Sequence, residues 1–79
     1  MSREDVLNKV NDIFKENFNK DDLLITEKTV ALDIPEWDSL EHINLINDIE
    51  DEFDMNFTMK EVTGMQSVGE MITIILERI

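Results

Sequence analysis

Hydrophobic residues recur at intervals of three and four from Glu4 to Phe18, which is the spacing of an amphipathic helix. Ser2 precedes this stretch and is a residue type that caps helices, and the acids of the first turn suit the positive end of the helix dipole. The pattern predicts a first helix over residues 4–18. Its apolar positions are Val6, Leu7, Val10, Ile13, Phe14 and Phe18.

The segment from Asn19 to Asp38 keeps no sustained helical or strand period. Loops of this length are uncommon in compact domains and often carry function. We therefore expect a long ordered loop, pinned across the helices by its scattered apolar side chains. These are Leu23, Leu24, Ile25, Val30, Leu32 and Ile34.

A second helix is predicted soon after Pro35, because proline disfavours a helical residue before it. Asp38 and Glu41 have the spacing of a capping box, which places Ser39 at the first helical position. The stripe expected to face the core is Leu40, Ile43, Ile46, Ile49 and Phe53. The opposite, acidic face is expected to hold Glu41, Asn44, Asp48, Asp51 and Glu52.

Two further helices are predicted near the end of the sequence. Thr58 is positioned to cap a short helical turn over residues 59–63, closed by Gly64, and Ser67 to cap a last helix. The apolar stripe of that helix is Val68, Met71, Ile72, Ile75, Leu76 and Ile79. The order predicts an all-α four-helix bundle, with three longer helices, one short helix and one domain over residues 1–79.

Composition supports this fold and narrows the function. The chain has no cysteine, two glycines and one proline, so disulfide staples, Cys-based zinc sites and a many-stranded β fold are disfavoured. Its formal net charge of −12 repels nucleic acid and anionic lipid surfaces and favours partners with basic patches. The charged start and the lack of a long apolar segment lead us to expect a cytoplasmic protein without membrane insertion.

The residues for catalysis are few. A lone His42, with no cysteine, HExxH motif or glycine-rich phosphate loop, predicts that the chain is not an enzyme. We interpret His42 as a partly exposed helix residue without a partner that would tune it. The acidic runs lack the alternating ligands and turn glycine of a calcium loop, so no specific metal site is expected.

The segment Trp37-Asp38-Ser39-Leu40-Glu41 carries the most specific information in the chain. Together with the following His42-Ile43-Asn44-Leu45-Ile46 and the acidic Glu50-Asp51-Glu52-Phe53, it resembles the acyl carrier protein family. An Asp-Ser-Leu triplet alone is short. Combined with its position near mid-chain, the acidic helix after it and the overall length, the resemblance extends over essentially the whole chain.

The resemblance implies that Ser39 is esterified with 4′-phosphopantetheine, taken from coenzyme A by a magnesium-dependent phosphopantetheinyl transferase. The terminal thiol of that arm would hold acyl groups as thioesters and supply the sulfur that a cysteine-free chain lacks. By position, Asp38 and Leu40 flank the attachment site. The residues expected to dock on basic patches of acyl-loading and acyl-transfer enzymes are Glu41, Asp48, Glu50 and Asp51.

The sequence departs from the family pattern at Asn44, where relatives often have an acid, and in the region of the short helix, which carries Lys60. Partner choice is therefore expected to differ from that of housekeeping fatty-acid carriers. Two alternatives stay open: a carrier of aminoacyl, peptidyl or D-alanyl groups, and an unmodified acidic interaction module. The acidic helix favours acyl cargo, and a monomer is expected.

An acyl chain could also enter the interior if the core side chains part; a closed core is the alternative. The residues expected to face such an interior are Ile43, Ile46, Phe53, Met65, Met71 and Ile75.

Overall fold

The first helix, α1, runs from Arg3 to Phe18 in the computed structural model, which describes residues 1–79. Ser2 and Asp5 form a reciprocal capping box: the Asp5 N–H donates to Ser2 Oγ at 3.1 Å, and the Ser2 N–H donates to the Asp5 carboxylate. Asn19 ends the helix in the left-handed conformation. The predicted first helix and its cap are confirmed.

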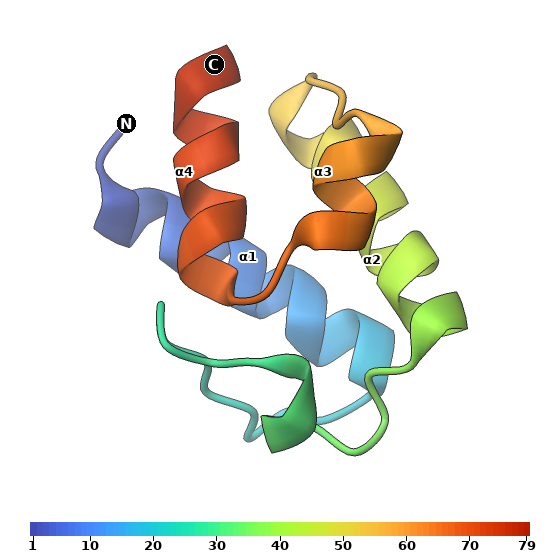
Figure 1. Ribbon diagram of the computed structural model, residues 1–79. Coiled ribbons are helices and arrows are strands. Elements are labelled where there is room, and N and C mark those ends of the chain that lie inside the picture. The colour runs from blue at the N-terminus through green and yellow to red at the C-terminus, as the bar shows by residue number, and fades with distance from the viewer.

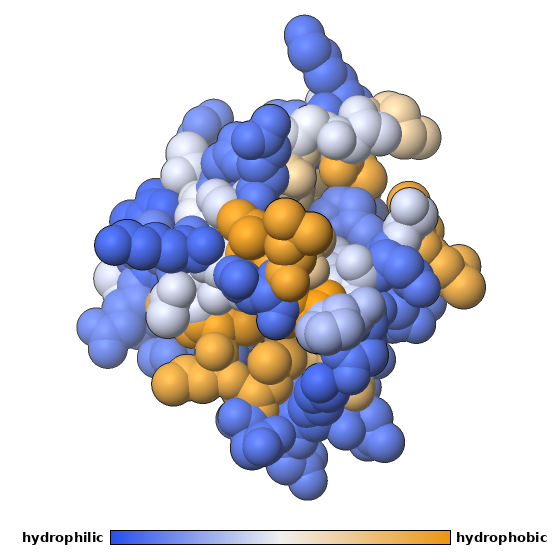
Figure 2. Space-filling model, turned by 60° about the horizontal axis from the view of Figure 1, so that its bottom comes forward, coloured by the Kyte–Doolittle hydropathy of each residue, from blue (hydrophilic) through white to orange (hydrophobic).

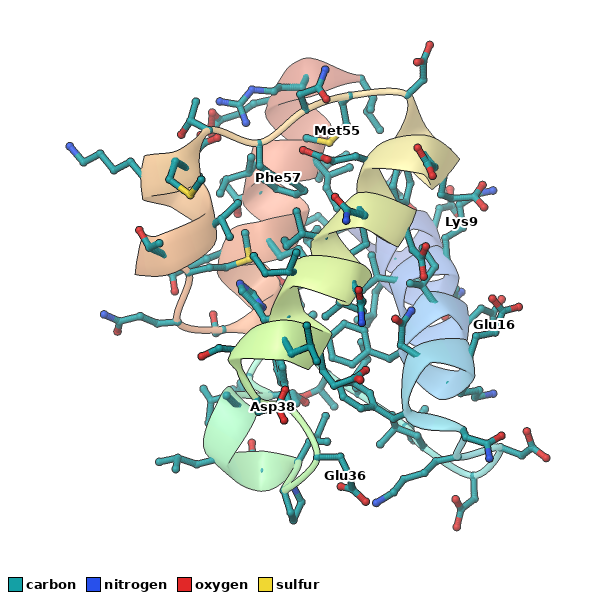
Figure 3. All side chains as sticks on the ribbon, turned by 90° about the vertical axis from the view of Figure 1, so that its right-hand side faces the viewer. Lys9, Glu16, Glu36, Asp38, Met55 and Phe57 are labelled. Carbon is teal, nitrogen blue, oxygen red and sulfur yellow. The ribbon has the colours of Figure 1, made fainter.

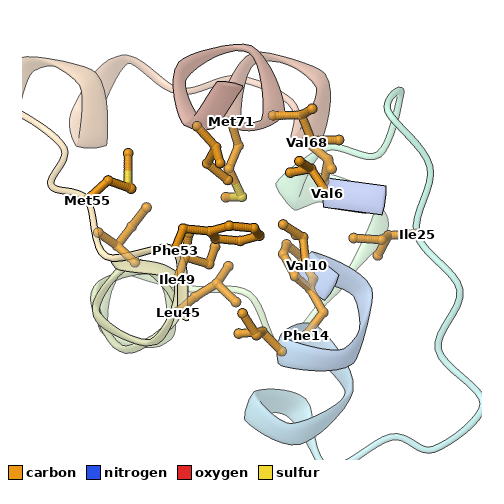
Figure 4. Packing of buried hydrophobic residues seen from close by; sticks show 14 of the residues in the cluster. Val6, Val10, Phe14, Ile25, Leu45, Ile49, Phe53, Met55, Val68 and Met71 are labelled. Carbon is orange, nitrogen blue, oxygen red and sulfur yellow. The ribbon is translucent and has the colours of Figure 1, made fainter. Parts of the chain in front are cut away.

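Three further helices follow (Figure 1): α2 over Ser39–Phe53, the short α3 over Met59–Gly64, and α4 over Val68–Arg78. Of these, α2 and α4 pack against α1. In Figure 4, side chains from α1, α2 and α4 meet with Ile25 of the loop in one apolar core. The predicted all-α architecture is confirmed. Its core comprises Val6, Val10, Ile13, Phe14, Phe18, Ile25, Ile34, Leu45, Ile46, Ile49, Phe53, Met55, Val68, Met71, Ile72 and Ile75.

The loop between α1 and α2 is ordered, as predicted, but contains a short 3₁₀ helix over Ala31–Asp33 that the sequence pattern did not predict. Ile25 and Ile34 are buried and hold the loop to the core. Leu24 and Leu32 are exposed, so the prediction that all the apolar loop residues pin it is wrong for these two. Figure 2, turned to bring the underside of the Figure 1 view forward, shows apolar residues in the middle of this face and at its lower left, between hydrophilic ones.

Polar contacts attach the loop to α1 and α4. The buried Asn11 side chain accepts from the Ile25 N–H at 2.8 Å. The first amides of α4 also donate to backbone carbonyls of the loop, since the Gly69 N–H donates to the carbonyl oxygen of Glu27 at 2.8 Å. The Arg3 guanidinium joins the same place by binding the Glu27 carboxylate and the Gly69 carbonyl. These contacts hold the middle of the loop to α1 and to the start of α4.

The inward face of α2 differs from the predicted stripe in its first two turns. Leu40 is 69% exposed and Ile43 is 47% exposed, whereas Leu45 is completely buried. On a helix, Leu45 lies about 40° from Ile49 and Ile43 about 120° away. The elements that cover α2 centre on Ile49, so Leu45 enters the core and Ile43 does not.

The caps predicted for the last two helices are confirmed. Thr58 forms a capping box with Glu61 at the start of α3, and the Ser67 side chain accepts from the Glu70 N–H at the start of α4. Gly64 is the last residue of α3 and has no left-handed backbone, so its predicted role as the residue beyond the helix is wrong. No helix in the structure has the length and apolar character needed to cross a bilayer.

Candidate functional site

Ser39 is the first residue of α2 and is exposed to solvent. The helix is capped by its neighbour, because the Glu41 N–H donates to Asp38 Oδ1 at 2.9 Å. The reciprocal half of the predicted capping box is missing, since the Asp38 N–H donates to the Glu36 carbonyl instead. Figure 3 shows Asp38 at the end of α2 that adjoins the loop. Capping by Asp38 leaves the Ser39 hydroxyl without a structural task.

The other two serines differ from Ser39 in this respect. The hydroxyls of Ser2 and Ser67 each accept a backbone N–H and cap a helix, at 3.1 and 3.3 Å respectively. The Ser39 hydroxyl makes no hydrogen bond within the protein, so it is the serine oxygen that an incoming group can reach without breaking a cap.

An open cleft of about 490 Å³ lies beside Ser39, between the start of α2 and the end of α3. Ile43 and Met65, both expected to face the interior, line this cleft together with Val62. The predicted interior residues Ile46, Phe53, Met71 and Ile75 are buried in the core. An apolar space therefore exists next to the serine, and it opens to the surface. The full lining is Ala31, Trp37, Asp38, Ser39, His42, Ile43, Val62, Thr63, Met65 and Gln66.

His42 has partners, contrary to the sequence interpretation. The Trp37 Nε1–H donates to His42 Nδ1 at 3.0 Å, and His42 Nε2 lies 3.0 Å from the Val62 carbonyl oxygen. Trp37 also packs edge-on against the Phe14 ring, with centroids 5.1 Å apart. The sequence could have indicated the pairing of Trp37 with His42, because the two residues are close in the chain, on either side of the start of α2. It could not have indicated the contact with Val62, which lies far along the chain in α3.

The predicted docking acids fall on two sides of α2. Glu41 and Asp48 border a polar hollow of about 460 Å³ shared with Glu16 of α1, which sequence reasoning did not include. In Figure 3, Glu16 lies on α1 alongside α2. Asp51 is exposed, and Asp48 accepts a hydrogen bond from the Asn17 amide at 2.8 Å.

Glu50 has a structural role that separates it from the other acids. Its carboxylate accepts the Phe57 N–H at 2.8 Å, and its side chain is half-buried at the turn between α2 and α3. The docking role expected of Glu50 stays a prediction, and this hydrogen bond gives its carboxylate a structural role as well. No group of three or more acidic or histidine side chains is arranged to hold a metal ion.

The short helix α3 is tied to α4 by Glu61. The Arg78 guanidinium binds both carboxylate oxygens of Glu61, at 2.7 and 2.6 Å. The hydrogen bond from Arg78, followed by the one from the Thr58 N–H, lowers the pKa of Glu61 from 4.5 to about 2. One wall of the cleft thus depends on a charged pair.

We expect Glu61 to make stability depend on pH below its ordinary pKa. Because its pKa is lower in the folded protein, its contribution is fully present above pH 4.5 and is lost as the pH falls toward 2. Glu61→Gln should therefore be less stable than the wild type near pH 6, with the difference shrinking toward pH 2. Urea unfolding across this range measures it. Asp12→Asn, an exposed acid without a partner, is the control, and a constant difference for Glu61→Gln would contradict the expectation.

Comparisons with known proteins agree on one family. An acyl carrier protein of Lactobacillus acidophilus is 32% identical over 75 residues, covering 95% of this chain and 94% of the relative. One from Phenylobacterium zucineum is 33% identical over 75 residues, covering 95% of each. The solution NMR structure of holo acyl carrier protein from Geobacter metallireducens matches with a TM-score of 0.86 and 32% identity, covering 92% of this chain and 84% of that one. No protein-family model matches the chain.

Proposed function

This chain belongs to the acyl carrier protein family, and on that premise we propose that Ser39 is the residue to which 4′-phosphopantetheine is attached. Members of this family are carriers and not enzymes, and they bind the arm covalently. The observation that carries the proposal is the exposed Ser39 hydroxyl, free of any hydrogen bond because Asp38 caps the helix.

The attachment of 4′-phosphopantetheine involves one bond formed and one broken. In the attachment reaction, Ser39 Oγ bonds to the phosphorus of coenzyme A that bears pantetheine. The bond from that phosphorus to the bridging pyrophosphate oxygen breaks, adenosine 3′,5′-bisphosphate leaves, and the hydroxyl proton passes to a base of the transferase. Asp38 holds the helix start in place, and the exposed Leu40 offers an apolar contact to the transferase.

The arm supplies a thiol that holds an acyl group as a thioester and carries it between enzymes. The cleft beside Ser39 supports aliphatic cargo, because Ile43, Val62 and Met65 line it. We infer delivery to cytoplasmic enzymes of fatty-acid, lipid or polyketide synthesis. An aminoacyl or peptidyl cargo is the alternative, and its polar groups would gain little from these apolar side chains.

The proposal is tested by incubating the protein with coenzyme A, magnesium and a phosphopantetheinyl transferase of broad specificity. Intact mass should increase by one phosphopantetheine, and peptide mapping should place it on the fragment containing Ser39. Absence of a mass increase, with a known carrier modified in parallel, would leave an unmodified interaction module as the function.

We also propose that the acidic side of α2, here meaning the carboxylates of Glu41 and Asp51, guides partners to Ser39. Reversal of both residues to lysine tests this. Neither carboxylate is paired within the protein, so both are available to a basic patch. Rim charges mainly affect association, so the rate of modification at low salt should fall about tenfold and lose its salt dependence. Stopped-flow or initial-rate assays against ionic strength measure this.

The matched control reverses Glu4 and Glu77, which lie near the two chain ends and change the net charge equally. Its modification rate should stay close to that of the wild type, and circular dichroism should show unchanged helix content in both variants. An equal fall in the modification rate of both double variants would mean that net charge alone, and not the acidic side of α2, sets recognition.

A further inference from the structure

The hydrogen bonds of His42 determine which of its nitrogens carries the proton. An indole N–H can only donate and a carbonyl oxygen can only accept. Trp37 Nε1–H therefore requires an unprotonated Nδ1, and the Val62 carbonyl requires a proton on Nε2, both over 3.0 Å. His42 is thus a neutral ring that accepts on one side and donates on the other.

This chain of bonds joins three separate parts of the molecule. Trp37 belongs to the approach to α2, His42 to the first turns of α2, and Val62 to α3. The Val62 carbonyl lies in the last turn of α3, where carbonyls lack partners within the helix. His42 supplies that missing donor.

The position of α3 depends on few contacts. None of its residues is fully buried, and Val62 is its one side chain that packs, half-buried, against the core. Its polar ties are the Glu61 pair with Arg78 at one side and the His42 bond to Val62 at the other. Trp37, His42 and Val62 all line the cleft beside Ser39, so the tie at His42 also forms its wall.

We propose that His42 is a positioning residue: bridging Trp37 and Val62, it holds α3 against α2 and sets how far an acyl chain attached through Ser39 is covered. The placement of α3 concerns the unmodified protein, and the cover of the acyl chain rests on the function proposed above. Without the bridge, α3 moves outward more often and the cleft opens. A long acyl chain then loses its cover, whereas an acetyl group is too short to be affected.

Three variants separate the bonds from the bulk of the side chain. His42→Phe keeps a ring but loses both bonds. His42→Gln keeps one acceptor and one donor on the same side chain, so it should restore much of the effect. Trp37→Phe loses the indole donor and part of the ring volume but retains an aromatic ring against Phe14, which guards against a result caused by misfolding.

The first measurement uses the unmodified protein and needs no arm. Amide exchange of α3, including the Val62 N–H bonded to the Thr58 carbonyl, should be about tenfold faster in His42→Phe than in wild type. Tenfold corresponds to about 1.4 kcal/mol, the scale of one or two net hydrogen bonds. Since the chain has one histidine and one tryptophan, ¹⁵N spectra also show directly whether Nε2 carries the proton and whether the indole N–H is protected.

The second measurement uses acetyl and octanoyl forms of the modified protein and the rate of thioester cleavage by hydroxylamine. In wild type, the octanoyl form should be cleaved more slowly than the acetyl form. His42→Phe should raise the octanoyl rate about tenfold and leave the acetyl rate unchanged, with His42→Gln close to wild type and Trp37→Phe intermediate.

The two measurements fail in different ways. Unchanged α3 exchange in a folded His42→Phe variant, or a proton on Nδ1, overturns the positioning role whatever happens at Ser39. Faster exchange with equal octanoyl and acetyl rates in every variant overturns the link to acyl cover. A wild-type protein that never gains the arm overturns the proposed function and leaves the exchange result standing.

Discussion

Ser39→Ala is expected to abolish attachment of phosphopantetheine while leaving the fold and its stability almost unchanged. The hydroxyl is the only bond-forming atom removed, and it makes no hydrogen bond within the protein. The N-terminal cap of α2 is Asp38, whose carboxylate accepts the Glu41 N–H at 2.9 Å. Alanine is also a good helix former, so the free energy of unfolding should change by less than about 0.5 kcal/mol.

Ser67→Ala is the matched control, because it removes a serine hydroxyl that does have a structural task. Ser67 Oγ accepts the Glu70 N–H at the start of α4, so its loss should lower the free energy of unfolding by about 1 kcal/mol. This variant should still be fully modified. Intact mass and urea unfolding of both variants therefore give opposite results, one losing the arm and the other losing stability.

An arm on Ser39→Ala would refute Ser39 as the attachment site, and peptide mapping would then identify the residue that carries it. A loss of more than about 1 kcal/mol in Ser39→Ala would instead show that the hydroxyl supports the helix start. The assay would then need a second variant, Ser39→Thr, to separate folding from modification.

Phe14→Ala is expected to cause the largest loss of stability among single substitutions considered for this protein. Phe14 is completely buried in α1 and packs against the rings of Phe18 and Trp37, at centroid distances of 5.8 and 5.1 Å. Removing a buried phenyl ring costs about 3–5 kcal/mol. A chain of this length has a total stability of roughly 4–12 kcal/mol, so the variant should be marginally folded at 25 °C.

The measurement is urea or thermal unfolding followed by circular dichroism. Leu32→Ala is the control, since Leu32 is 95% exposed and its loss should change the free energy of unfolding by less than about 0.5 kcal/mol. Trp37 emission should also shift in Phe14→Ala, because its ring loses an edge-on neighbour. A loss below about 1 kcal/mol would mean that the core can collapse around the vacated space.

The helix starts could be predicted because capping is a local interaction. Ser2, Thr58 and Ser67 each accept an N–H three residues ahead, and such spacing is visible in the sequence itself. Asp38 behaves likewise, so its spacing to Glu41 placed Ser39 at the first helical position. The resemblance to the acyl carrier protein family then identified Ser39 as the candidate attachment residue. The missing half of its capping box was not predictable, because the Asp38 N–H is taken by the Glu36 carbonyl through the turn of the loop.

Which side chains of α2 point into the core, and which partners its polar residues bind, depended on elements distant in sequence. A period of three and four allows several adjacent stripes, and only the packing of α1 and α4 selected Leu45 for the core and left Leu40 and Ile43 outside. The family resemblance placed Glu50 among the docking acids, and no spacing in the sequence indicated that its carboxylate also accepts the Phe57 N–H.

By itself, then, the sequence determined the four helices, the side chains that cap their starts, the acidic character and the place of Ser39 at a helix start, because these follow from residue type and short-range spacing. Only the tertiary structure decided that an apolar cleft adjoins Ser39 and that His42 bridges Trp37 and Val62. The physical reason is that a cleft and a bridging hydrogen bond each require groups from the loop, α2 and α3 at once. Their distances are set by how the helices pack, and no periodicity along the chain encodes that packing.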